Sequence, residues 1–221
     1  MTEAEWNTST DPEAMYQIVE NGAFKTGYGV SPKTTRRRVF FGAACCRLVW
    51  PWIEVDPRCV QMIDFIENQF DTELSKDERE RLKFNVHMAA EEPEADTSDL
   101  QYIAANLVSN CEIPFNAIRY LLLRFKMWGD VSTRAAQISD IMRCIIGNPF
   151  RPVTLLPEWR TSTVLALAEG IYAERAFDRL PILADALEEA GCDHADMLNH
   201  CRGPGAHVRG CWVVDLVLGK E

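Results

Sequence analysis

The segment Leu180-Pro-Ile-Leu-Ala-Asp-Ala-Leu-Glu-Glu-Ala-Gly191 decides the fold class of this chain. Its residues Leu180, Leu183 and Leu187 recur at the spacing of one helix face, and its acidic residues turn outward. Gly191 follows the last apolar residue of the pattern, and a glycine at this position commonly ends a helix in the left-handed conformation. The segment therefore predicts an amphipathic helix that ends at Gly191.

The same signals recur along the chain. A capping side chain stands directly before a proline at three places, Asp11-Pro12, Ser31-Pro32 and Asp56-Pro57. Ser75-Lys-Asp-Glu78 has the pattern of a capping box. Apolar residues at helical spacing fill residues 60–70, 100–108, 115–125, 135–145 and 164–172, and no long strand-like alternation interrupts them. We therefore expect an all-α fold, a multi-helix bundle of about ten helices.

The end of the chain, Cys211-Trp-Val-Val-Asp-Leu-Val-Leu218, is ambiguous by itself. Its β-branched residues suit a strand, but the sequence offers no second strand with which it could pair. We interpret it as a buried closing helix that is entered through Gly203-Pro-Gly205.

Composition and charge exclude several classes of function. The 221 residues are 47% hydrophobic and 25% charged, which is typical of a globular protein with a substantial core. The net charge of −10 argues against binding to nucleic acid or to an anionic membrane. The acidic start, Met1-Thr-Glu-Ala-Glu-Trp6, lacks the features of a signal peptide, and no apolar run is long enough to span a membrane. We expect a cytoplasmic protein whose eight cysteines are reduced thiols.

A break in the helical pattern falls at Gly147-Asn-Pro-Phe-Arg-Pro152, where a glycine and two prolines come close together. We expect residues 1–147 to form an N-terminal helical bundle, with residues 148–221 as a C-terminal helical region packed on it. A single domain is the alternative.

Cysteine and histidine residues are densest between residues 192 and 211. Thiolates and imidazoles together are the usual ligands of zinc, and our candidate metal ligands are His200, Cys201, His207 and Cys211. A helix that begins near Pro204 would place His207 and Cys211 four residues apart on one face. The spacing matches no standard zinc module, so buried thiols with surface histidines remain the alternative. A nucleophilic pair of His207 with Cys201 or Cys211 is a further hypothesis.

Other residues are candidates for binding. Phe150 and Arg151 belong to types that are enriched at protein interfaces, although their segment also suits a linker packed on the core. The segment Gly203-Pro-Gly205, with Arg202 and Arg209 around it, could form an anion-binding turn at the start of a helix. The alternative is a purely structural turn between two helices. The binding candidates are Phe150, Arg151, Arg202, Gly203, Gly205, Arg209 and Trp212. The basic cluster of Lys33 and residues 36–38 suits an acidic partner or ion pairs with the chain's own acids.

Several motifs resemble those of a large family of uncharacterised bacterial proteins. They are Phe41-Gly-Ala-Ala-Cys-Cys-Arg47, Gly147-Asn-Pro-Phe-Arg-Pro152, Phe177-Asp-Arg-Leu-Pro-Ile-Leu-Ala-Asp-Ala-Leu187, His200-Cys-Arg-Gly-Pro-Gly205 and His207-Val-Arg-Gly-Cys-Trp212. The resemblance covers most of the chain and implies no catalytic residue, because no activity is established for the family.

Taken together, the sequence favours a non-enzymatic helical binding module that has no cofactor and whose partner is another protein. The alternative is a small zinc-binding or Cys/His-dependent protein with its site in residues 192–211, in which zinc is the cofactor.

Overall fold

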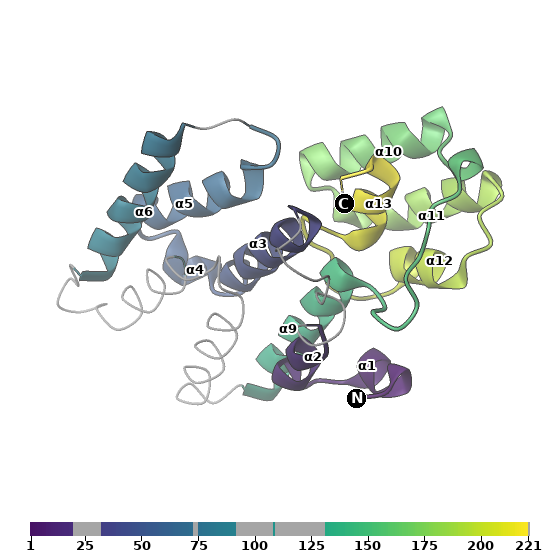
Figure 1. Cartoon of the computed structure of the whole chain (residues 1–221), viewed down its shortest axis with the longest axis horizontal. Helices are drawn as coiled ribbons and strands as arrows, with labels where there is room; N and C mark the ends of the chain where they lie inside the picture. Colours follow the sequence, from purple (N-terminus) through teal and green to yellow (C-terminus); the bar gives the residue numbers. More distant parts are fainter. Residues whose placement is uncertain (20–31, 73–74, 92–107, 109–130, 221) are drawn as a thin grey trace. The chain divides into compact units, whose positions relative to one another are not determined.

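The computed structural model describes residues 1–19, 32–72, 75–91, 108 and 131–220, and within them the regular structure is entirely helical (Figure 1). The all-α fold predicted from the sequence is confirmed. The α-helices are α1 (Glu3–Thr8), α2 (Pro12–Ile18), α3 (Pro32–Arg47), α4 (Trp50–Ile53), α5 (Pro57–Asn68), α6 (Lys76–Glu91), α9 (Val131–Ile146), α10 (Ser162–Glu174), α11 (Leu180–Glu189), α12 (Ala195–Arg202) and α13 (Trp212–Leu218). Two short 3₁₀ turns, η2 (Pro157–Trp159) and η3 (Phe177–Arg179), precede α10 and α11.

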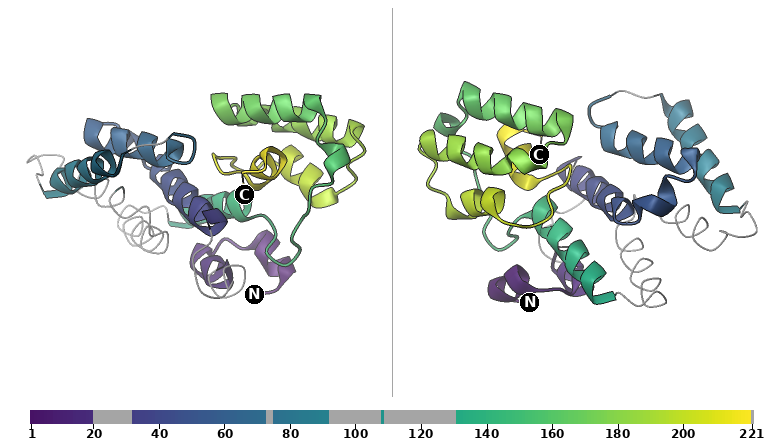
Figure 2. Two further views of the ribbon diagram at one scale, coloured as in Figure 1. Left: turned by 45° about the horizontal axis from the view of Figure 1, so that its top comes forward. Right: turned by 180° about the vertical axis from the view of Figure 1, so that it is seen from behind.

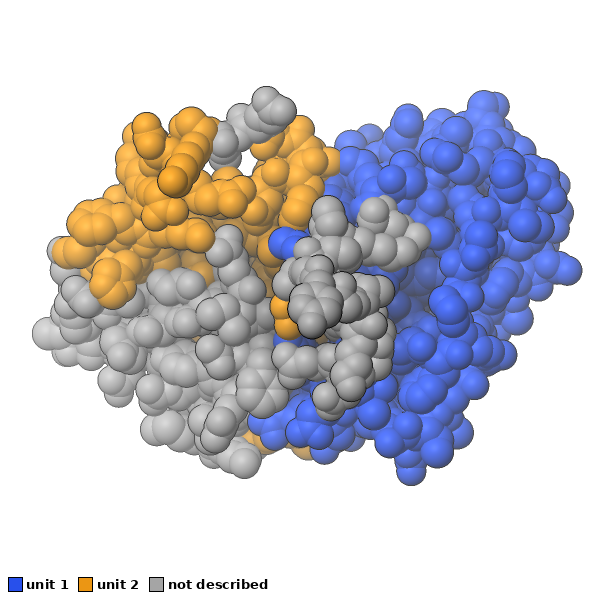
Figure 3. Space-filling model, viewed as in Figure 1, with its two compact units in different colours: residues 1–37, 135–221 blue, residues 38–134 orange. Residues whose placement is uncertain are grey.

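The chain forms two compact units (Figure 3). Unit 1 comprises residues 1–37 and 135–221, and unit 2 comprises residues 38–134. The break expected at residues 147–152 lies inside unit 1, between α9 and η2. A division of the chain at residue 147 stays a prediction.

The helix starts predicted at the capping residues Asp11, Asp56 and Ser75 are present. The Asp11 carboxylate accepts a hydrogen bond from the Ala14 N–H at 3.0 Å, and the Asp56 carboxylate accepts one from the Arg58 N–H at 2.8 Å. Ser75 caps α6 by accepting from the Glu78 N–H at 3.2 Å. Ser31 and the helical segments predicted at residues 100–107 and 115–125 lie outside the described residues.

Helices α10 to α13 lie close together in unit 1 (Figure 2), and their buried apolar side chains form one hydrophobic core. The helix predicted from the opening segment is α11, which buries Leu180, Leu183 and Leu187. It ends as predicted, because Gly191 has a φ of +89° and the Cys192 N–H reaches the Leu187 carbonyl at 2.9 Å.

The last helix, α13, is buried on nearly all sides, and this confirms the closing helix that the sequence predicts. It begins at Trp212, however, and residues 203–211 are not helical. The hypothesis of a helix that begins near Pro204 is therefore wrong. Gly203, Gly205 and Gly210 lower helix propensity across this short stretch, which accounts for the difference.

A buried ion pair fixes α13 to the start of α3. Nε of Arg36 donates to Oδ2 of Asp215 at 2.9 Å, and Nη2 donates to Oδ1 at 3.2 Å and to the Tyr172 hydroxyl at 2.9 Å. Both charged residues are less than 7% exposed. Burial raises the pKa of Asp215, although the paired guanidinium of Arg36 acts in the opposite direction. Arg36 belongs to the basic cluster seen in the sequence, so one member of that cluster pairs with an acid of the chain inside the core.

In unit 2, α5 packs against α6 and buries one apolar face, which includes Met62, Ile63 and Ile66. The guanidinium of Arg47 spans Glu67 and Asp64, with its shortest bond, to Glu67, at 2.7 Å. Cys45 and Cys46 are both fully buried, as expected of thiols that act as small apolar side chains. None of the described helices is long and apolar enough to cross a membrane.

Replacing Arg36 with methionine is expected to destabilise the protein by about 3 kcal/mol or more, because the Asp215 carboxylate would remain buried without its partner. The double variant Arg36→Met/Asp215→Leu should recover much of this loss, since it leaves no buried charge. Urea unfolding followed by circular dichroism measures both. A double variant less stable than Arg36→Met would contradict this explanation.

Candidate metal centre

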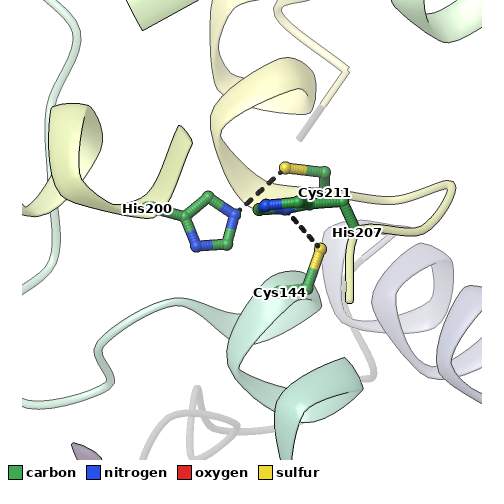
Figure 4. A group of neighbouring side chains, drawn as sticks. All are labelled: Cys144, His200, His207 and Cys211. Atoms are coloured by element: carbon green, nitrogen blue, oxygen red, sulfur yellow. Dashed lines mark hydrogen bonds between the residues drawn. The ribbon is translucent and has the colours of Figure 1, made fainter. Parts of the chain in front are cut away.

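Four side chains of unit 1 converge on one point: Cys144, His200, His207 and Cys211 (Figure 4). One potential ligand atom from each lies within 4.8 Å of the others. Both cysteines are buried and both histidines are half-buried. No other group of this kind occurs among the described residues.

Two nitrogen–sulfur pairs have the spacing of ligands around a zinc ion. Nε2 of His200 lies 3.3 Å from Sγ of Cys211, and Nδ1 of His207 lies 3.8 Å from Sγ of Cys144. A nitrogen and a sulfur ligand of one tetrahedral zinc are roughly 3.5 Å apart, given the usual bond lengths. The four ligands therefore need to contract by only about 1 Å to hold a zinc ion.

Gly147 brings the end of α9, which carries Cys144, close to the start of α13. Its φ of +74° ends the helix one turn after Cys144. A Cβ placed on Gly147 would lie only 3.1 Å from the indole of Trp212, so only glycine fits here without displacement. The carbonyl of Gly147 also accepts a hydrogen bond from the indole N–H of Trp6 at 3.1 Å.

His200 occupies the last turn of α12, and its imidazole contacts the aromatic rings of Trp212 and His207. It lies 5.4 Å from the indole of Trp212 and 4.9 Å, edge to face, from the ring of His207. The helix ends at Gly203, where a Cβ would lie 3.0 Å from the carbonyl oxygen of Asn199. The small residue thus lets the chain turn sharply back from α12 toward His207.

A tight turn then places Cys211. Gly210 has a φ of +89°, and the Cys211 N–H donates to the Val208 carbonyl at 3.0 Å. Cys211 is the residue before the first turn of α13, and its carbonyl accepts from the Asp215 N–H at 2.9 Å. The last ligand therefore precedes the helix that the buried Arg36–Asp215 pair anchors.

The two thiols have different proton affinities. Burial raises the pKa of Cys144, and its hydrogen bond to Cys211 raises it further. Burial also acts to raise the pKa of Cys211, but hydrogen bonds from Cys144 and His200 and the nearby charge of His200 lower it below its usual value.

A cavity of about 510 Å³ adjoins the cluster. Cys144, His200 and His207 contribute to its wall, whereas Cys211 does not. Trp6 and Trp212 form apolar parts of the wall.

The structure brings together three of the four ligands that the sequence suggests: His200, His207 and Cys211. Cys201 is buried but is not part of the group, and Cys144 is the fourth member. Nothing in the sequence around Cys144 marks it as a ligand, because it lies in an ordinary amphipathic helix far upstream of the others. Cys192 and His194 also lie outside the group.

Of the candidate binding residues, Gly203, Gly205 and Trp212 line the cavity beside the cluster, whereas the other four do not. Phe150 is 39% exposed, and Arg151 pairs with Glu3. Arg202 binds Asp185 and Glu188 at 2.7 and 2.6 Å, which neutralises its charge.

The remaining candidates surround the turn after α12. Nothing lies within 4 Å of a Cβ placed on Gly205, and Arg209 lies 4.5 Å from the ring centroid of Tyr172. Because residues 203–211 are not helical, the anion site that the sequence suggests at a helix start near Pro204 lacks its helix.

Gly147→Ala is expected to destabilise the protein more than Gly191→Ala. Both glycines have positive φ values, so both substitutions strain the backbone, but only the methyl group at residue 147 meets Trp212. We expect this crowding to add roughly 1–3 kcal/mol to the loss in unfolding free energy, measured with urea. Equal losses in the two variants would show that the contact with Trp212 has no effect.

No family model, no curated protein and no solved structure matches the chain.

Proposed function

We propose that this protein binds one zinc ion through Cys144, His200, His207 and Cys211, and that the metal stabilises unit 1. The observation that carries the proposal is the convergence of four suitable ligand atoms within 4.8 Å. The ligands come from α9, α12, the turn after α12 and the residue before α13.

Buried thiols and histidines without a metal explain the cluster less well. The two contacts between sulfur and imidazole are weak hydrogen bonds, at 3.3 and 3.8 Å. Nε2 of His207 is buried and has no hydrogen-bond partner among the described residues. A ring nitrogen of His207 therefore has no partner in the metal-free protein, and Nδ1 would exchange its long contact with Cys144 for a bond to the metal.

The ligand set favours zinc over other metals. Two thiolates and two imidazoles suit a tetrahedral zinc site, whereas calcium and magnesium prefer oxygen ligands. Two thiolates also balance the charge of Zn²⁺, so the complex can be buried without a net charge.

Four protein ligands favour a structural rather than a catalytic role. A catalytic zinc keeps one position for water or substrate, and a closed Cys₂His₂ set leaves none. The alternative of a nucleophilic cysteine is weakened because the Cys211 thiol is 1% exposed and does not line the cavity. The protein partner expected from the sequence stays a prediction.

Protein purified without a histidine tag is expected to contain one zinc per chain, measured by elemental analysis. Cys144→Ser should abolish stoichiometric zinc, because it removes one of the four ligands. Cys201→Ser is the matched control, since Cys201 is equally buried in the same core but lies outside the group.

Removal of the metal with a chelator should lower the melting temperature of the wild type, because a ligand that binds only the folded state stabilises it. The same treatment should leave the melting temperature of Cys144→Ser unchanged. Zinc retained in Cys144→Ser but lost in Cys201→Ser would instead support the ligand set suggested by the sequence. A wild type that takes up no zinc would overturn the proposal.

A further inference from the structure

The cavity beside the cluster contacts most of the proposed ligands. Three of the four ligands, Cys144, His200 and His207, line this space of about 510 Å³. A proposed metal site needs both an entry path and groups that orient the ligands from outside the first coordination shell.

One carboxylate of the cavity wall has an oxygen atom without a hydrogen-bond partner among the described residues. The charged residues that line it are Asp140, Arg143 and Asp196. Nη2 of Arg143 pairs with Asp140 at 2.7 Å, while Nη1 donates to the carbonyls of Trp6 and Ser9. Oδ1 of Asp196 lies 3.7 Å from Arg151, and its Oδ2 is buried without a hydrogen-bond partner among the described residues. The three charged residues of the wall sum to −1, which attracts cations, although the ion pair with Arg151 offsets part of the charge of Asp196.

Asp196 is also placed to act on His200. The two residues are four apart on α12, so their side chains lie on the same helix face, and both line the cavity. Nε2 of His200 faces Cys211, so a metal bound there leaves the proton of the ring on Nδ1. Histidine ligands usually donate that second N–H to a carboxylate or a carbonyl, which fixes the ring.

We propose that the metal reaches its ligands through this cavity and that Asp196 is the carboxylate that attracts it and then positions His200 by accepting a hydrogen bond from Nδ1–H. Asp196 is a positioning residue in this proposal, which rests on the proposed function. The competing explanation is structural, because Asp196 lies in the first turn of α12, where a carboxylate stabilises a helix.

The experiment compares the full-length wild type with Asp196→Asn and Arg151→Gln. The first variant keeps the shape of the side chain but removes its charge. The second variant also removes the ion pair between Arg151 and Asp196 but keeps the Asp196 carboxylate, so it is the matched control. Zinc affinity is measured by competition with a chromophoric chelator, and the metal-free proteins are compared by thermal melting. The absorption spectrum of bound Co²⁺ reports the ligand geometry.

We expect Asp196→Asn to weaken zinc binding on the order of 10- to 100-fold and to alter the Co²⁺ spectrum, with a metal-free melting temperature close to that of the wild type. Arg151→Gln should bind zinc within about twofold of the wild type. Equal zinc affinity in Asp196→Asn and wild type would overturn the inference and leave the proposed function intact. Equal weakening in both variants would also overturn it, since the ion pair would then be the cause. A wild type that binds no zinc would instead refute the proposed function itself.

Discussion

The close approach of two buried thiols and two imidazoles is the constraint on which the C-terminal part of unit 1 depends. Cys144, His200, His207 and Cys211 come from four separate places in the chain, and their ligand atoms lie within 4.8 Å of one another. Such a group gains little from its own weak contacts, which measure 3.3 and 3.8 Å. A bound Zn²⁺ would convert the same arrangement into a neutral, tightly held junction of α9, α12 and α13.

Helix α13 shows how such a junction is combined with ordinary packing. Cys211 stands directly before its first turn, and one turn later Asp215 meets the buried guanidinium of Arg36. Trp212, between them, contacts the ring of His200 and lies close to Gly147. A seven-residue helix has little stability alone, so these polar and aromatic contacts, together with its apolar burial, hold it in place.

The sequence predicts the helices better than it predicts the site. Caps such as Asp11 and Asp56, and the left-handed glycine after α11, are local signals that short-range hydrogen bonds determine. His200, His207 and Cys211 could be proposed because they are close in the sequence. Cys144 could not, because its role depends on the packing of α9 against the end of the chain, which no local pattern encodes. Cys201 is a plausible ligand from the sequence because it follows His200 directly. Adjacent residues of a helix point to different faces, however, so the two side chains diverge.

X-ray absorption at the zinc edge, on protein loaded with one equivalent of zinc, tests the central claim most directly. The account predicts a first coordination shell of two sulfur atoms at about 2.3 Å and two nitrogen atoms at about 2.0 Å. The Cys201→Ser variant should show the same two sulfur atoms. A shell of oxygen and nitrogen atoms alone would contradict it, because the metal would then be bound at another place on the protein.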